Sequence, residues 1–180
     1  MDFIVGLNRK NYKNIIAENY LCVPAVLETI LRSDDILGID KYMIANYFGI
    51  VLPPEIVYSQ VKNCSHSDDT KQQGVILKYD SINNFFKDNK IPLHEQYAKI
   101  NLIHKDFFTD YIFDILTSRK HIICGYEFHT LYGSTGDYAG HVSIIINVGV
   151  NKDDVYLLDP EPKNPGLKMI SALNLDHAIS

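Results

Sequence analysis

Residues 19–31 have the sequence Asn-Tyr-Leu-Cys-Val-Pro-Ala-Val-Leu-Glu-Thr-Ile-Leu, and the rest of the chain is best interpreted outward from them. Apolar side chains recur in pairs at positions 22/23, 26/27 and 30/31, which is the spacing of one buried helical face. Pro24 is compatible only with the first turn of a helix, so it fixes the helix start close to Cys22. The stretch therefore predicts a helix that begins at a cysteine.

This position gives Cys22 a possible chemical role. A thiol at a helix N-terminus lies at the positive end of the helix dipole, which favours the nucleophilic thiolate. Free cysteines are also among the residues most often buried, and position alone slightly favours a small apolar side chain on the helical face. Cys22 is thus a candidate nucleophile that needs partners elsewhere in the chain.

Two later segments supply a base and a carboxylate. Gly140-His141 opens a run of β-branched residues, which predicts a strand over 141–148, and a turn at 151–154 leads to a partner strand over 155–159. Alternation places the odd-numbered residues 141–147 on one face and the even-numbered residues 142–148 on the other. A simple antiparallel register puts Asp159 opposite a position a few residues beyond His141, and a twist or bulge would close that gap.

Together these residues match the layout of a nucleophile with its base and orienting carboxylate. Cys22 is the expected nucleophile, His141 the general base and acid, and Asp159 the group that fixes the histidine tautomer. Each has an ordinary structural explanation by itself, such as a strand histidine or an Asp-Pro turn. Their joint order and placement favour a catalytic triad.

The order of the predicted elements indicates an α+β fold in a single domain spanning residues 1–180, with helices first and an antiparallel sheet last. Further helices are expected at 40–49, at 56–61, from Ser81 and at 105–118, with a polar surface loop at 63–74. His129 and Tyr132 follow a predicted strand at 121–126. They are candidates for lining a cleft near His141, and a surface loop is the favoured prediction for both.

Composition excludes several classes of protein. The formal net charge is −5 and no basic block is present, so nucleic acid is not an expected partner. The longest apolar runs are too short to span a membrane, and no signal peptide is recognised, which favours a cytoplasmic setting. Three widely spaced cysteines, at 22, 64 and 124, argue against a disulfide framework and against a structural zinc site. The polar cluster around Cys64 and His66 is therefore expected to be a surface loop without metal.

The three motifs carry a resemblance. Leu21-Cys22-Val-Pro-Ala, Gly140-His141-Val-Ser-Ile and Leu-Leu-Asp159-Pro160 resemble the papain-like superfamily of cysteine peptidases. They are most similar to its bacterial, bacteriocin-processing-type (C39-like) branch. The resemblance covers residues 14–173. It implies a papain-like fold in which the nucleophile helix packs on a C-terminal antiparallel sheet, and a Cys-His-Asp mechanism that cleaves a peptide or amide bond without a cofactor.

Two positions depart from that family. Val23 stands where the family has glycine after the cysteine, and Ile16 stands where it has a glutamine that binds the oxyanion. Asn19 or Asn14 is an expected substitute donor, alongside the backbone N–H of Cys22. The departures leave two alternatives open: a degenerate papain-like domain that binds a peptide or protein partner, and an acyltransferase on the same fold.

Overall fold

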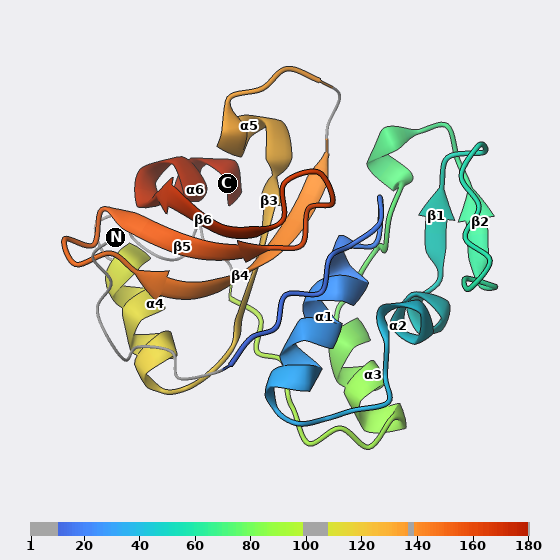
Figure 1. The fold of residues 1–180 in the computed structure, drawn as a ribbon, viewed down its shortest axis with the longest axis horizontal. Helices are drawn as coiled ribbons and strands as arrows, with labels where there is room; N and C mark the ends of the chain where they lie inside the picture. The colour runs from blue at the N-terminus through green and yellow to red at the C-terminus, as the bar shows by residue number, and fades with distance from the viewer. Residues whose placement is uncertain (1–10, 99–107, 137–138, 180) are drawn as a thin grey trace.

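Three α-helices lie in the first half of the described chain, and the second half holds a four-stranded antiparallel sheet with three further α-helices (Figure 1). This confirms the expected mixture of helix and sheet. The computed structural model describes residues 11–98, 108–136, 139–179. In chain order the elements are α1 (Cys22–Ser33), α2 (Lys41–Phe48), β1 (Ile50–Leu52), β2 (Cys64–His66), a 3-10 helix (Thr70–Gln72), α3 (Ser81–Asp88), α4 (Phe108–Thr117), β3 (Ile122–Glu127), α5 (Phe128–Tyr132), β4 (Gly140–Val148), β5 (Asp154–Asp159), β6 (Gly166–Ser171) and α6 (Ala172–Ile179).

The helix that begins at Cys22 links the two halves. Val26 and Ile30 on one side of α1 pack against Ile144 of β4. Leu27 and Leu31 on another side belong to a cluster shared with α2 and α3. Each of these side chains is at least 97 % buried. Full burial of such a side chain stabilises a fold by roughly 1.5–3 kcal/mol, so this double-sided packing fixes α1 firmly between sheet and helices.

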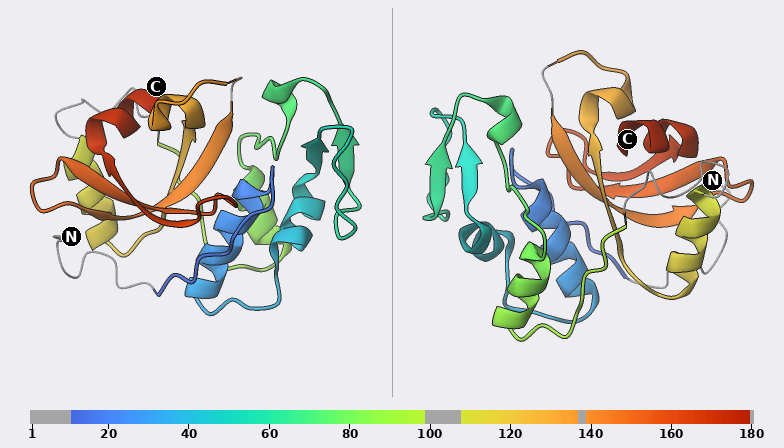
Figure 2. Two further views of the ribbon diagram at one scale, coloured as in Figure 1. Left: turned by 45° about the horizontal axis from the view of Figure 1, so that its top comes forward. Right: turned by 180° about the vertical axis from the view of Figure 1, so that it is seen from behind.

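The sheet has strand order β3-β4-β5-β6, and every neighbouring pair is antiparallel. Its two faces are covered differently. One face packs on α4, α5 and α6 in the largest hydrophobic cluster, and the other packs on α1 (Figures 1 and 2). The ends of β4 and β5 that carry His141 and Asp159 therefore lie at the boundary between the two halves.

A β-bulge decides which side chains share a face. Ile144 pairs with Leu158 across β4 and β5, but the register shifts by one residue between Ile145 and Asn147. A bulge of this kind inserts one extra residue and reverses the alternation beyond it. Val148 consequently joins Ile145 in the α4–α6 cluster, so the prediction of unbroken alternation over 141–148 was wrong at its last two positions.

Other differences lie in the first half. Residues 56–61 form turns rather than the expected helix, because Ile56 and Val61 both turn inward to the cluster around Leu52. The stretch 63–74 is not a plain loop, since β2 pairs in parallel with β1 there. The expected helix over 105–118 is observed as α4, with residues 105–107 outside the described residues. Across the described ranges no helix combines the length and apolar character needed to cross a bilayer.

Candidate active site

His141 lies at the start of β4, directly after Gly140, and pairs with Tyr126 of β3. The rings of Tyr126 and Phe128 meet the imidazole edge-on, each with its centroid 5.5 Å away. Only 11 % of the side chain is exposed. These contacts restrict the ring to one orientation and place it in surroundings of low polarity.

Asp159 ends β5 and meets that ring. Its Oδ1 accepts a hydrogen bond from His141 Nε2 at 2.7 Å, and its side chain is 1 % exposed. Continuing the register of Ile144 with Leu158 by one step puts Asp159 opposite Ser143, two residues from His141 and on the same face. Without the bulge Asp159 would face Ile144 and point to the other side of the sheet. The bulge therefore creates the expected contact between these two residues.

The electrostatics of the pair favour an imidazolium facing a carboxylate. Burial by itself lowers the pKa of His141, but hydrogen bonds and charge interactions with Asp159 and Cys22 outweigh it and raise the pKa to about 9. Burial likewise raises the pKa of Asp159, and the contacts with His141, Glu161 and Tyr132 reverse this and lower it. At neutral pH the contact is therefore a buried ion pair.

Cys22 lies at the start of α1, and its thiol is half-buried. It is near enough to the same ring to contribute to the raised pKa of His141. Because Asp159 occupies Nε2, the ring nitrogen left for the thiol is Nδ1. The structure thus places Asp159 in direct contact with the His141 ring and Cys22 near it, and their catalytic roles stay a prediction.

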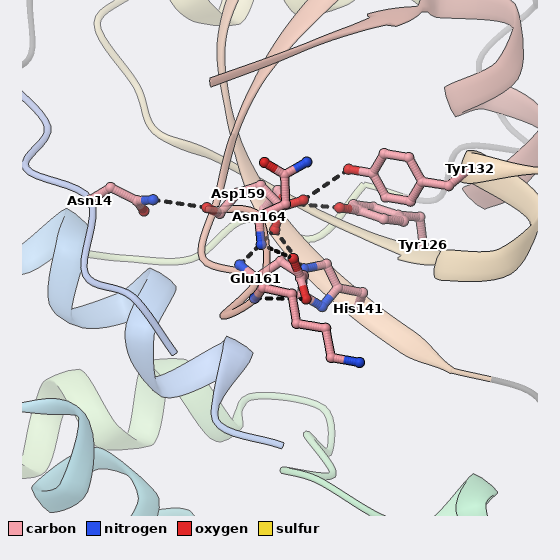
Figure 3. A network of polar contacts seen from close by, with 9 residues as sticks. Asn14, Tyr126, Tyr132, His141, Asp159, Glu161 and Asn164 are labelled. Atoms are coloured by element: carbon pink, nitrogen blue, oxygen red, sulfur yellow. Dashed lines mark hydrogen bonds and ion pairs between the residues drawn. The ribbon is translucent and has the colours of Figure 1, made fainter. Parts of the chain in front are cut away.

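Sequence reasoning did not predict which groups hold the carboxylate, although it named Tyr132 as a less favoured candidate for lining a cleft near His141. Tyr132 donates its hydroxyl to Asp159 Oδ2 at 2.8 Å, and the backbone N–H of Glu161 donates to Oδ1 at 2.9 Å (Figure 3). The surface loop favoured for Tyr132 was wrong: residues 128–132 form helix α5, which Gly133 ends in the left-handed conformation. That glycine directly after Tyr132 is the sequence signal that could have revealed the helix.

The segment before Cys22 is tied to the end of β5. The side-chain amide of Asn14 donates to the carbonyl of Asp159 at 2.8 Å, from the side opposite Tyr132 in Figure 3. Three residues later, the N–H of Ala17 donates to the carbonyl of Pro160 at 2.8 Å. Two hydrogen bonds therefore join the chain that leads to the thiol to the strand end that carries the carboxylate.

A charged network holds the same segment from α2. Lys41 Nζ lies 2.7 Å from Glu18 Oε2 and donates to the carbonyl of Ile16 at the same distance. Tyr42 donates to the other oxygen of Glu18. Beyond Glu18 the chain turns through Tyr20, whose φ of 70° is unusual for a residue other than glycine. The entry to α1 is thus fixed on several sides.

The groups expected to donate to an oxyanion lie in different surroundings in the structure. Asn14 is engaged with the Asp159 carbonyl, so its amide acts in the assembly of the site. Asn19 lies in the exposed turn three residues before Cys22, and its backbone carbonyl accepts from Tyr58. Ile16 is 49 % exposed and has no polar side-chain atom. The role of Asn19 stays a prediction, and the backbone N–H of Cys22 lies in the first turn, where such groups have no partner within the helix.

A second histidine–carboxylate contact lies at the other end of α1 from Cys22. His121 Nε2 lies 2.8 Å from Asp34 Oδ2, and its Nδ1 lies 2.7 Å from the Tyr12 hydroxyl. Because protein groups occupy both ring nitrogens, this cluster serves to join the N-terminal segment, α1 and β3. A surface depression of about 750 Å³ near Arg32 lies at this end of α1, away from Cys22.

The other polar candidates do not form a metal centre. Cys64 is exposed, and His66 Nδ1 lies 3.2 Å from the carbonyl of Pro53. Burial raises the pKa of Cys124 to about 12, which leaves it a neutral core thiol. Among the described residues, no three His, Cys, Asp or Glu side chains are placed to share a metal ion.

In comparisons with known proteins, no protein-family model matches this chain and no curated protein matches it significantly.

Proposed function

We propose that this protein is a papain-like cysteine hydrolase that cleaves a peptide or amide bond, with Cys22 as nucleophile, His141 as general base and acid, and Asp159 as orienting carboxylate. The observation that carries the proposal is one imidazole shared by two partners. Asp159 binds its Nε2 at 2.7 Å while the thiol at the start of α1 interacts with the same ring.

The reaction would proceed through a thioester. In the reactive form the Cys22 proton resides on His141, and the thiolate Sγ attacks the carbonyl carbon of the substrate. The imidazolium gives this proton to the leaving amine as the carbon–nitrogen bond breaks. Water then attacks the thioester, with His141 taking its proton, and the acid product and free thiol are released. Asp159 stays ionised throughout and keeps Nε2–H hydrogen-bonded.

Three physical features support this assignment. The start of α1 places Sγ at the positive end of the helix dipole. The pKa of His141 is raised to about 9, so a positive imidazolium can face the substrate's leaving group as a proton donor. The low exposure of both His141 and Asp159 strengthens their interaction relative to one in water.

The test is a search for cleavage that depends on Cys22. Purified protein is incubated with a diverse peptide mixture, and new termini are identified by mass spectrometry. Cleavages that appear with the parent and vanish with Cys22→Ala support hydrolysis, and Cys64→Ala is the matched control. Adding a primary amine distinguishes the acyltransferase, which would yield amide products in place of acids. If neither acid nor amide products that depend on Cys22 form with any substrate class, the proposed activity is refuted.

A second candidate is a domain that binds a peptide without cutting it. The exposed apolar side chain of Ile16 favours it, because no side-chain oxyanion donor stands there. Losing one such donor costs about 2.7–4 kcal/mol of transition-state stabilisation. Cys22→Ala would retain peptide affinity in either case, so only turnover separates the two.

A further inference from the structure

We infer that Tyr132 is a positioning residue for the triad, and that it is the last member of a buried hydroxyl chain, Ser143–Tyr126–Tyr132, which aims the Asp159 carboxylate at His141. The inference rests on the proposed function, because aiming the carboxylate matters only if His141 serves Cys22.

The three hydroxyls are neighbours. Ser143 Oγ and the Tyr126 hydroxyl lie 2.8 Å apart. The side chains of Tyr126 and Tyr132 influence each other's pKa, and Tyr132 donates to Asp159 Oδ2 at 2.8 Å. Figure 3 shows both tyrosine hydroxyls directed toward the end of β5. Three hydroxyls thus lead from the middle of the sheet to one oxygen of the carboxylate.

Donor counting gives this chain a direction. A hydroxyl has one proton to donate, and Asp159 as a carboxylate can only accept. Tyr132 must therefore give its proton to Oδ2, which leaves its own oxygen free to accept. In the proposed chain Tyr126 supplies that proton and accepts in turn from Ser143, with which its hydroxyl is in contact. If Tyr132 instead donated to Tyr126, Oδ2 would lose its side-chain donor.

Burial keeps the chain in this state. Ser143 is fully buried and Tyr126 is 5 % exposed. Burial and the nearby charge of Asp159 raise the pKa of Tyr126 and of Tyr132 well above the ordinary value. Both phenols therefore stay protonated as donors across the whole pH range in which the protein would work.

The division of the carboxylate oxygens explains why the chain would aim it. Oδ1 serves His141 Nε2 and the Glu161 N–H, whereas Tyr132 is the side-chain donor found on Oδ2. Holding Oδ2 prevents rotation about the bond that would move Oδ1 away from the imidazole. Helix α5 is itself braced next to His141, because the Glu127 side chain accepts from Thr130 N–H and Ala139 N–H.

The test is the titration of His141, followed by NMR of its ring carbon protons in parent and Tyr132→Phe. Loss of aim weakens the histidine–carboxylate contact, so we expect the pKa of His141 to fall by about half a unit to one unit, a threefold to tenfold change in proton affinity. Tyr126→Phe leaves Tyr132 in place without its donor, and should shift the titration in the same direction by less.

Tyr47→Phe is the matched control, since Tyr47 also donates to an aspartate, Asp88 at 2.6 Å, in the helical half. An unchanged His141 titration in folded Tyr132→Phe would overturn the inference. A rise in the pKa of His141 in Tyr132→Phe would also overturn it, because it would mean that the Tyr132 hydrogen bond only weakens the interaction of Asp159 with the imidazolium. If Tyr132→Phe does not fold, a Tyr126→Phe variant in which the pKa of His141 is unchanged overturns the inference equally.

Alkylation of Cys22 is measured in parallel, so that the two proposals can fail separately. A Cys22 without enhanced reactivity refutes the proposed function. A reactive Cys22 together with an unchanged His141 titration in the tyrosine variants refutes only the hydroxyl chain.

Discussion

Replacing Asp159 by asparagine would remove one buried charge and almost nothing else. Asparagine keeps an oxygen that can accept from His141 Nε2 and from the Glu161 N–H, the two donors at Oδ1. Its amide would then face the Tyr132 hydroxyl, which can rotate its proton and accept instead. The shape of the site is thereby preserved while the ion pair is lost.

The size of the effect follows from the histidine. The pKa of His141 is raised from 6.5 to about 9 against the opposing effect of burial. A rise of about 2.5 units corresponds to about 3 kcal/mol of preference for the imidazolium. Asp159 contributes through both a hydrogen bond and its charge, and the charge disappears in the variant. We therefore expect the pKa of His141 to fall by at least about one unit, a tenfold loss of proton affinity.

The assay is NMR titration of the imidazole from pH 5 to 10, with His141→Gln used to assign its resonance among the seven histidines. The reasoning would be refuted by a parent His141 that titrates near 6.5. It would also be refuted by an Asp159→Asn variant whose His141 titrates within a few tenths of a unit of the parent.

Three further predictions concern stability. Ile144→Ala should lower the free energy of unfolding by about 2–5 kcal/mol, because Ile144 is 1 % exposed between β4 and α1. Asn14→Ala should cost about 1 kcal/mol through its lost bond to the Asp159 carbonyl. Because His141 has a raised pKa, its contribution is complete below pH 6.5 and lost as pH rises through about 9. The stability advantage of the parent over His141→Gln should shrink by up to about 3 kcal/mol across that interval. Urea unfolding checks all three, the last at several pH values.

Contrary outcomes are equally definite. A cost under 1 kcal/mol for Ile144→Ala would mean that α1 does not depend on the sheet. An Asn14→Ala variant of parent stability would mean that the Asp159 carbonyl is satisfied without it. A parent and His141→Gln whose stabilities run parallel from pH 6.5 to 9 would contradict the raised pKa of the histidine.

Local signals in the sequence predicted the elements that carry the three central residues. Pro24 placed the helix start at Cys22, and the helix expected at 40–49 is observed as α2, with Asp40 as its N-cap and Gly49 as its C-cap. These features depend on neighbours within a few positions, so they are visible without any tertiary contact.

The finer geometry depended on contacts between distant residues. The one-residue bulge before Asn147 has no local marker, yet it determines whether Asp159 meets His141. The tyrosine that holds Oδ2 comes from a five-residue helix, shorter than a periodicity pattern can reveal. The Asn14 bond joins residues 145 positions apart. Sequence patterns identified the reacting groups, and tertiary packing selected the groups that support them.

The most direct test of a poised Cys22 is its alkylation rate at pH 6. Parent and His141→Gln are treated with limiting iodoacetamide, and modification of Cys22 and Cys64 is followed by peptide mass spectrometry. Cys64 is the exposed internal reference. The triad predicts that Cys22 reacts at least about tenfold faster than Cys64 in the parent, and that His141→Gln removes this advantage without changing Cys64. The triad would be contradicted if Cys22 reacted no faster than Cys64 in the parent, or if Cys22 reacted equally fast in the parent and in His141→Gln.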